Sequence, residues 1–237
     1  MVNIGNMLVI ITGASKGIGH ELMKKFAKTE YMVIAVSRNV KSIQTYIQNN
    51  NVVNILPLQA DISKKTGLDK IKKTCKQINK PISIVVNNAG EILVKPFAKI
   101  SDKELRSVYQ TNVFAPYLLV QSLLPWMGKK TNSHIVNISS MGGFQGSAKF
   151  AGLSAYSSSK AALVGITECL AEELKDSNIS VNCLAIGAVQ TEMLSKAFPG
   201  YKAPLNANEM ANYIYDFATK GHQYFNGKIL PVSSTTP

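Results

Sequence analysis

Short runs of apolar, often β-branched residues recur along the chain and alternate with longer segments whose apolar positions repeat every three or four residues. Most of the short runs lack strict alternation of apolar and polar positions, which is typical of strands covered on both faces. The longer segments have the period of amphipathic helices. We expect strands at Met7 to Thr12, Met32 to Ser37, Asn54 to Ala60, Ile82 to Asn88, His134 to Ser139, Ile179 to Ile186 and Lys228 to Val232. We expect helices at Gly17 to Thr29, Val40 to Gln48, Leu68 to Ile78, Ser101 to Met127, Ala155 to Lys175 and Asn206 to Thr219.

This regular exchange of strand and helix predicts the fold class. It implies right-handed crossovers and an α/β domain with a doubly wound, seven-stranded parallel sheet covered by helices on both faces. The 237 residues suit one such domain, spanning 1–237. Ligands of these sheets lie outside the carboxyl ends of the strands, so we expect the function in the strand-to-helix loops. The segment from Gly187 to Leu205 is too long for an ordinary connection and is predicted to be a lid over the substrate site.

Charge and cysteine content narrow the function classes. The 26 Lys and Arg against 14 Asp and Glu give a formal charge of +12, which would attract nucleic acid. The lysines are spread over several predicted helices, so we expect no nucleic-acid partner and a smaller phosphate-bearing ligand instead. No apolar run approaches the roughly 20 residues of a membrane span. Three cysteines without metal-ligand spacing argue against a disulfide framework and a metal site, so we expect a cytoplasmic protein.

A glycine-rich loop follows the first predicted strand and leads directly into a helix, with the sequence Thr12-Gly13-Ala14-Ser15-Lys16-Gly17-Ile18-Gly19. Glycines allow the backbone to turn sharply and approach a pyrophosphate, and the helix start offers free N–H groups to it. The spacing differs from the usual G-x-G-x-x-G fingerprint and is not a P-loop. Taken alone, the loop also fits a tight turn without a ligand.

Further polar motifs lie at the ends of later predicted strands or within the helices that follow them. They are Asn87-Asn88-Ala89-Gly90, Asn112, the pair Ser139-Ser140, and Tyr156 with Lys160. Each has a structural explanation on its own, as a turn, a core amide, a local hydrogen bonder or a helix-surface pair. Together and in this order, they resemble the short-chain dehydrogenase/reductase superfamily over essentially the whole chain, including its TGxxxGxG and YxxxK motifs and its Rossmann fold.

The resemblance implies a role for each of these residues. Tyr156 would be the general acid in carbonyl reduction or the base in alcohol oxidation, and Ser140 would bind the carbonyl oxygen. Lys160 would hold the nicotinamide ribose, and Asn112 would position a water molecule beside Lys160. Ser139 fits the serine pattern as well, and we choose Ser140 because the family usually uses the second serine of a pair. The coenzyme would contact Thr12, Gly13, Ser15, Lys16, Gly17, Ile18, Gly19, Ser37, Arg38, Asp61, Ile62, Asn88, Ala89, Gly90, Tyr156, Lys160, Gly187, Val189 and Thr191.

Tyr156 and Lys160 are four residues apart and project from one side of a helical turn. The phenol has an ordinary pKa of about 10, too high for a base near neutrality. A lysine ammonium about 6 Å away, at an effective dielectric of about 20, lowers this pKa by about two units. Lysine alone is therefore insufficient, and we expect full activation only with bound oxidised coenzyme.

The coenzyme is predicted to be NADP(H). An acidic residue about 20 positions after the glycine loop normally binds the ribose of NAD. Ser37-Arg38 occupies this position, and Arg38 can bind a 2′-phosphate bidentately, with Lys16 as a second cation. Arg38 could instead stack on adenine or face solvent. Asp61 would approach the adenine or cap the next helix.

The substrate is expected to be a small carbonyl or alcohol compound, which the sequence does not identify further. Apolar residues that could line its pocket are Met141, Phe144, Phe150, Met193, Leu194 and Phe198, although such residues are as often core. Ser140 and Tyr156 are 16 positions apart, which implies an insertion around Ser147 to Gly152 relative to the family. Glu91 could select a substrate or point away. We expect a homodimer or homotetramer, and the alternative function is a coenzyme-binding sensor or scaffold without turnover.

Overall fold

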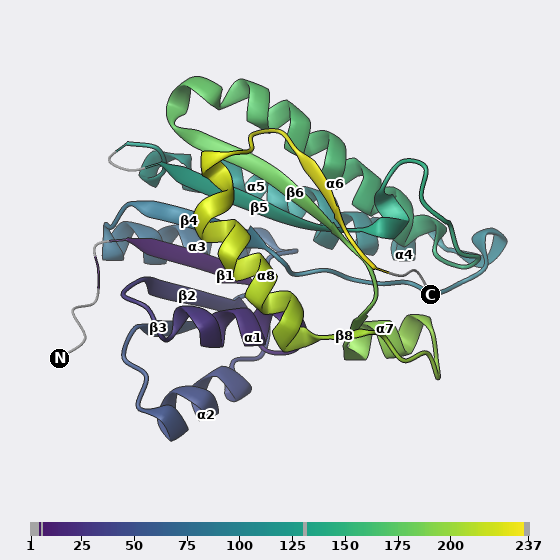
Figure 1. Cartoon of the computed structure of the whole chain (residues 1–237), viewed down its shortest axis with the longest axis horizontal. Helices are drawn as coiled ribbons and strands as arrows, with labels where there is room; N and C mark the ends of the chain where they lie inside the picture. The colour runs from purple at the N-terminus through teal and green to yellow at the C-terminus, as the bar shows by residue number, and fades with distance from the viewer. Residues whose placement is uncertain (1–4, 6, 130–131, 235–237) are drawn as a thin grey trace.

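The computed structural model describes residues 5, 7–129 and 132–234, and its central sheet confirms the predicted fold class. All seven strands are parallel, in the spatial order β3-β2-β1-β4-β5-β6-β9 (Figure 1). Because the chain continues from β1 toward β2 on one side and later returns to β4 on the other, the order reverses between β1 and β4. A crevice for a ligand is expected at this point. The strands are β1 (Leu8–Thr12), β2 (Met32–Ser37), β3 (Ile55–Gln59), β4 (Ile82–Asn87), β5 (Ser133–Ser140), β6 (Ile179–Ile186) and β9 (Ile229–Val232).

Helices cover both faces of the sheet (Figure 1). One face carries α1 (Gly17–Phe26), α2 (Lys41–Asn50) and α8 (Ala207–Lys220). The other carries α3 (Lys65–Ile78), α4 (Asp102–Tyr109), α5 (Ala115–Leu123) and α6 (Ser154–Glu173). Single 3₁₀ turns lie at Phe97–Lys99, Leu124–Trp126, Met141–Gly143, Lys175–Ser177 and Gly221–Gln223. None of the helices among the described residues is long and apolar enough to cross a membrane.

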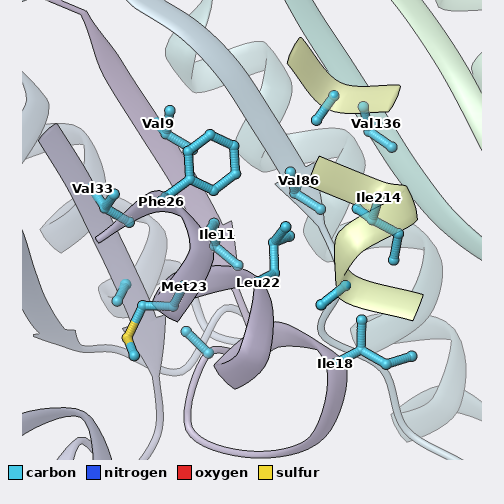
Figure 2. Packing of buried hydrophobic residues seen from close by; sticks show 14 of the residues in the cluster. Val9, Ile11, Ile18, Leu22, Met23, Phe26, Val33, Val86, Val136 and Ile214 are labelled. Carbon is cyan, nitrogen blue, oxygen red and sulfur yellow. The ribbon is translucent and has the colours of Figure 1, made fainter. Parts of the chain in front are cut away.

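The two helical layers explain why the strands read as continuous apolar runs. Val9 and Ile11 of β1 pack with α1 and α8, whereas Leu8 and Ile10 pack on the opposite face, and all four are fully buried. In Figure 2, Phe26 of α1 lies close to Val9 among the side chains of this first layer. Burying each such side chain is worth roughly 1.5–3 kcal/mol. Burial on both faces therefore stabilises β1, the strand that leads into the glycine loop.

The prediction of one continuous α-helix from Ser101 to Met127 is wrong. The chain forms α4, then a π-helical turn at Gln110–Phe114, then α5. The backbone N–H of Ala115 bonds to the carbonyl of Gln110, five residues back, instead of four. Pro116 follows, and it has no N–H to direct to the carbonyl of Asn112 as an α-helix requires. This break places Asn112 in a wide turn that is buried against α6.

A buried histidine ties α8 to the sheet. His134 of β5 is 1% exposed; its Nδ1 lies 3.0 Å from the carbonyl oxygen of Ala218, and its Nε2 lies 3.0 Å from the amide nitrogen of Asn182. A proton on Nδ1 and an acceptor at Nε2 satisfy both contacts, so the neutral ring fits this place. The pKa of His134 is lowered to about 4, mainly by burial; the bond to Ala218 opposes this shift and the nearby His222 adds to it.

The predicted lid segment is partly ordered structure. It contains β7 (Val189–Gln190) and the short helix α7 (Glu192–Ala197). Its two ends are joined, because β7 pairs with β8 (Leu205–Asn206) as a small two-stranded sheet. The segment therefore leaves and re-enters the body of the protein at one place.

Candidate active site

The loops after β1 and β4 are joined by hydrogen bonds around the buried Thr12 hydroxyl. Thr12 Oγ1 accepts hydrogen bonds from the backbone N–H groups of Asn88 and Ala89, both at 3.1 Å. The Asn88 amide donates back to the Thr12 carbonyl at 2.9 Å. These loops flank the point where the strand order reverses, so three of the predicted coenzyme residues meet there.

Two glycines of the loop are required by close backbone contacts. A Cβ at Gly13, whose φ is +71°, would lie 2.9 Å from the Cα of Ala89. A Cβ at Gly19 would lie 2.4 Å from both the Gly13 carbonyl oxygen and the Asn88 amide nitrogen. Larger residues would therefore push the loop away from β4 and away from any ligand in the crevice.

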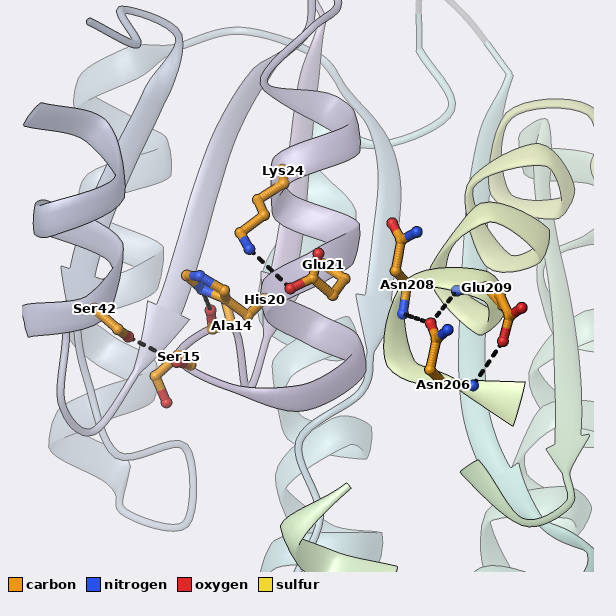
Figure 3. A network of polar contacts seen from close by, with 9 residues as sticks. All are labelled: Ala14, Ser15, His20, Glu21, Lys24, Ser42, Asn206, Asn208 and Glu209. Atoms are coloured by element: carbon orange, nitrogen blue, oxygen red, sulfur yellow. Dashed lines mark hydrogen bonds and ion pairs between the residues drawn. The ribbon is translucent and has the colours of Figure 1, made fainter. Parts of the chain in front are cut away.

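The start of α1 retains N–H groups for a ligand. Lys16 is the N-cap of α1 and supplies no side-chain cap, so the first N–H groups of the helix have no acceptor from it. Two carbonyls of the loop are already engaged, since His20 donates to Ala14 at 3.2 Å and Ser42 donates to Ser15 at 2.7 Å (Figure 3). The groups left over are thus donors, which suit an anion.

The end of β2 carries positive charge. Ser37 is buried and Arg38 is exposed, and the Arg38 carbonyl accepts a hydrogen bond from Gln59 at 3.1 Å. Asp61 turns its carboxylate to Ser63, at 2.7 Å from the hydroxyl and 3.1 Å from the N–H. The alternative of a helix N-cap at Asp61 is wrong, because the N-cap of α3 is Lys64.

The pKa of Asp61 reflects the positive charges around its carboxylate. Partial burial raises its pKa, but the bonds from Ser63 and the charges of Arg38 and Lys64 outweigh it, and the net pKa lies below the ordinary value. The Arg38 guanidinium therefore acts on the space between the ends of β2 and β3. The neighbouring Ile62 is buried.

Lys16 does not point freely into this space. Its ammonium forms an ion pair with Glu192 of α7, and both side chains are about two-thirds exposed. Close by, a Cβ at Gly17 would lie 3.5 Å from the methyl group of Thr191. The lid segment therefore meets the glycine loop at two neighbouring positions.

Tyr156 and Lys160 lie one turn apart near the start of α6. The Lys160 ammonium is 5.9 Å from the centre of the Tyr156 ring, close to the separation assumed from the sequence. It donates a hydrogen bond to the Ile138 carbonyl at 2.8 Å and is 4% exposed. Burial lowers the pKa of Lys160 to about 8, partly offset by Cys183, so the ammonium still predominates at neutral pH.

Burial, rather than the lysine charge, dominates the pKa of Tyr156. It raises this pKa above the ordinary value, and a hydrogen bond with Ser140 lowers it in part. The charge of Lys160, which was expected to lower this pKa, is therefore not its main influence in the protein without a ligand. In the absence of another positive charge, Tyr156 remains a protonated phenol.

The two adjacent serines have different surroundings. Ser139 is 1% exposed, and its hydroxyl donates to the Lys160 carbonyl at 2.9 Å. The Ser140 hydroxyl accepts a hydrogen bond from the Gly142 N–H at 3.1 Å and faces the same pocket as Tyr156. Ser139 thus holds α6 to β5, while Ser140 is open to a ligand.

Asn112 clamps the segment that follows β4. Its amide oxygen accepts from the Glu91 N–H at 2.8 Å, and its amide nitrogen donates to the Glu91 carbonyl and to Ser159 Oγ, both at 2.9 Å. A Cβ at Gly90 would lie 3.5 Å from both the Asn112 amide oxygen and the Lys160 ammonium. The structure therefore brings Gly90, Asn112 and Lys160 together.

Glu91 points away from this group. Its carboxylate accepts hydrogen bonds from Ser107, at 3.0 and 3.1 Å, and from Thr111 at 3.0 Å. Both donors precede Asn112 on α4 and the π-helical turn. Glu91 thus anchors that turn and does not face the pocket.

A pocket opens over Ser140 and Tyr156. Its volume is about 750 Å³ when the open solvent at its mouth is included. The lid forms one wall, and Phe198 meets Phe150 of the predicted insertion with ring centres 5.1 Å apart and the rings nearly perpendicular. The described lining residues are Ile18, Ile92, Ser140, Met141, Gly142, Phe150, Leu153, Tyr156, Ile186, Gly187, Ala188, Val189, Thr191, Met193, Leu194, Ala197 and Phe198.

Most of the apolar residues predicted for the pocket do line it, and Phe144 does not. The lining residues that the sequence did not indicate are Ile92, Gly142, Leu153, Ile186, Ala188 and Ala197. Ile92 follows the Asn-Ala-Gly motif closely, and Leu153 precedes α6, so nearness to a motif was the available signal. Within residues 5, 7–129 and 132–234, no three His, Cys, Asp or Glu side chains gather as metal ligands, and the three cysteines are free.

Comparisons with known proteins agree with this arrangement. A 3-oxoacyl-acyl-carrier-protein reductase of Aquifex aeolicus is 28% identical over 245 residues, covering 98% of each chain. Two solved structures share the fold: L-sorbose reductase of Gluconobacter frateurii with NADPH and L-sorbose, and 4-hydroxyisoleucine dehydrogenase with NADH. The first has a TM-score of 0.86 at 23% identity and covers 99% of this chain and 98% of that one. The second has a TM-score of 0.84 at 24% identity and covers 96% of this chain and 97% of that one.

A family model described as short chain dehydrogenase matches residues 7–202, which include the glycine loop, the Asn88 loop, both serines and the Tyr156–Lys160 pair. The match spans most of the 237 residues. The chain therefore belongs to the short-chain dehydrogenase family of oxidoreductases.

Proposed function

We propose that the protein is an NADP(H)-dependent oxidoreductase that interconverts a carbonyl compound and the corresponding alcohol. The observation that carries the proposal is that Ser140 and Tyr156 line one pocket, with the buried Lys160 ammonium 5.9 Å from the Tyr156 ring. A proton donor, a hydroxyl for the carbonyl oxygen and a nearby cation are the groups that this reaction requires of a protein.

The residues at the crevice fit a dinucleotide. Gly13 and Gly19 let the glycine loop pack closely against the loop after β4, and the α1 N-terminus lacks a side-chain cap. A Cβ at Gly90 would lie 3.5 Å from the Lys160 ammonium, so the backbone at Gly90 adjoins a cation that suits the ribose hydroxyls next to a nicotinamide. When bound, the coenzyme supplies or accepts the hydride.

Arg38 supports NADP(H) over NAD(H). Ser37, Arg38 and Asn39 follow one another at the end of β2, and none carries the carboxylate that would bind an unmodified ribose. The exposed guanidinium is free to bind a phosphate bidentately. The relatives use either coenzyme, so the proposal rests on this chain's own residues.

Tyr156 is proposed to move the proton. In reduction its hydroxyl donates to the carbonyl oxygen while the Ser140 hydroxyl donates a second hydrogen bond to the same atom. Its raised pKa keeps the proton in place until a substrate and a further positive charge are present. In oxidation the tyrosinate formed beside the Lys160 ammonium accepts the proton from the alcohol.

Exposed apolar side chains support the proposed self-association. Phe114, Tyr117 and Leu118 on the π-helical turn and α5 are each more than two-fifths exposed. Multi-angle light scattering that reports a monomer at micromolar concentration would reject the homodimer or homotetramer.

The function is tested with Tyr156→Phe and the control Tyr213→Phe, which removes an equivalent hydroxyl from the surface of α8. We expect loss of general acid catalysis to lower kcat by roughly 10²–10⁴-fold in Tyr156→Phe alone, measured as NADPH oxidation with a panel of aldehydes and ketones. Coenzyme binding without any turnover would instead support a sensor. Absence of coenzyme binding would reject both.

A further inference from the structure

The wall of the pocket around Tyr156 is almost entirely apolar. Among the described residues no charged side chain lines it, and the polar side chains present are the hydroxyls of Ser140, Tyr156 and Thr191. The Thr191 hydroxyl already accepts a hydrogen bond from the Leu194 N–H at 3.3 Å, as the N-cap of α7. The pocket thus keeps its hydrogen-bonding capacity beside Ser140 and Tyr156, where a carbonyl oxygen would lie.

Several charged residues near the pocket in sequence are bound elsewhere. Each has a partner that holds its charge outside the lining: Glu91 with Ser107 and Thr111, Lys95 with Glu104, Lys149 with the carbonyls of Phe144 and Ser147, and Lys16 with Glu192. The Lys160 ammonium is turned to the Ile138 carbonyl. A carboxylate placed in the pocket would therefore meet no cation along its walls.

The short helix α7 has its apolar residues on the side of the pocket and its charged residues on the side of the solvent. Leu194 lines the pocket, as do Ala197 and Phe198 one turn further along the chain. Glu192, Ser195 and Lys196 are exposed on the outer side. This arrangement directs the charge of the lid to solvent and its apolar side to the substrate.

The far wall is an aromatic contact between two segments distant in sequence. Phe150 comes from the insertion that lengthens the spacing between Ser140 and Tyr156, and Phe198 ends the lid helix. Leu153 and Met193 also line the pocket. A substrate whose carbonyl reaches Ser140 and Tyr156 must lay the rest of its body against these side chains.

We propose that the substrate is an uncharged ketone or aldehyde with an apolar body, and that carboxylates, amino acids and polyhydroxylated carbonyl compounds are rejected. This inference rests on the proposed function and names its substrate class. The physical reason is that an ion or several hydroxyls transferred into this pocket lose hydration without gaining partners.

The test compares 2-octanone with 7-oxooctanoate, which has the same chain and differs by a terminal carboxylate. Methyl 7-oxooctanoate restores neutrality at a larger size. We expect kcat/KM at saturating NADPH to be at least about 100-fold lower for 7-oxooctanoate than for 2-octanone. We expect the ester to recover most of the difference.

Two variants place the same charge on opposite sides of α7. Leu194→Arg adds a guanidinium at the pocket wall, where it can pair with the carboxylate of 7-oxooctanoate. The ratio of kcat/KM for 2-octanone to that for 7-oxooctanoate should therefore fall at least about 10-fold. Ser195→Arg adds it on the outer side and should leave the discrimination unchanged. Equal narrowing in both variants would overturn the proposal, since the effect would then come from long-range charge.

Calorimetric binding of the three ligands to the NADPH-loaded protein separates the inference from the proposed function. If no carbonyl compound is reduced but 2-octanone still binds more tightly than 7-oxooctanoate, the proposed function is rejected and the apolar ligand class is retained. Equal affinity or equal kcat/KM for the two compounds would overturn the inference while leaving the function intact.

Discussion

The adjacent serines at the end of β5 offer a direct test of the candidate site, because one of them faces the pocket and the other faces the core. Ser139→Ala and Ser140→Ala remove the same group from neighbouring positions. Ser139 donates to the Lys160 carbonyl at 2.9 Å and is 1% exposed, whereas Ser140 bonds with Tyr156 and lines the pocket. The two variants should therefore fail in different ways.

Ser140→Ala should be a catalytic variant. Removal of one hydrogen-bond donor to a developing oxyanion typically costs 10²–10³-fold in kcat, about 3–4 kcal/mol of transition-state stabilisation. The bond from the Gly142 N–H to Ser140 is also lost, which should lower the free energy of unfolding by about 1 kcal/mol. Because the Ser140 bond lowers the pKa of Tyr156, its loss should shift the alkaline rise of the oxidation rate to higher pH.

Ser139→Ala should be a stability variant. It removes one buried hydrogen bond, while the Lys160 carbonyl keeps its backbone bond within α6, and it should lower the free energy of unfolding by about 0.5–1.5 kcal/mol. Since Ser139 does not face the pocket, kcat should stay within about 10-fold of the parent, with an unshifted pH profile.

Steady-state kinetics across pH and urea denaturation measure both properties in each variant. A 100-fold loss of kcat in Ser139→Ala with near-normal turnover in Ser140→Ala would refute the assignment of the two serines. A large loss in both, without any shift of the pH profile in Ser140→Ala, would refute the role of the bond to Tyr156.

Three further predictions concern the coenzyme and the core. Arg38→Asp should raise the KM for NADPH by roughly 10–100-fold and improve the use of NADH. The control Lys28→Asp, before the amino end of β2, should change neither. Unchanged coenzyme preference in Arg38→Asp would contradict the assignment. Glu192→Gln should lower the KM for NADPH about 2–5-fold, because it releases Lys16 and removes a carboxylate near the phosphates; a higher KM would show that the ion pair assists binding. For His134, the folded-state pKa of about 4 lies below the ordinary 6.5, so its contribution to stability is present above pH 6.5 and is lost as the pH falls toward 4, by up to about 3 kcal/mol. Urea unfolding should show this loss in the parent and a smaller one in His134→Asn, and equal slopes would contradict it.

The sequence predicts the strands and the residues at their ends, because both depend on local pattern. Apolar runs such as the one ending at Thr12 stay strands in the structure, since helices cover both their faces. The carboxyl ends of parallel strands meet at one edge, so motifs there are brought together whatever the details between them. Tyr156 and Lys160 are likewise close because one helical turn separates them.

Features that depend on contacts between distant segments could not be predicted in this way. The break in the helix around Asn112 involves Pro116, a residue compatible with a helix start, and no periodicity marks a π-helical turn. Lys16 was expected to be available to a phosphate, but its partner Glu192 lies 176 positions away. The pKa of Tyr156 was estimated from one neighbouring charge, while burial, which requires the packed structure, has the larger effect.

The positions of the charged groups link these observations. Lys160 is buried and still mostly protonated at neutral pH, and it is held by a backbone carbonyl in place of a carboxylate. A carboxylate partner would neutralise its field at Tyr156, whereas a carbonyl orients the ammonium and leaves its charge effective. The same burial raises the pKa of Tyr156, so it disfavours the charged form of both groups, and each additional positive charge in the crevice favours the tyrosinate. An apolar substrate body strengthens this coupling, because it excludes water from the crevice and lowers the local screening. Among the described lining residues, the lack of charged side chains would therefore serve both the proposed selection of the substrate and the proposed movement of the proton.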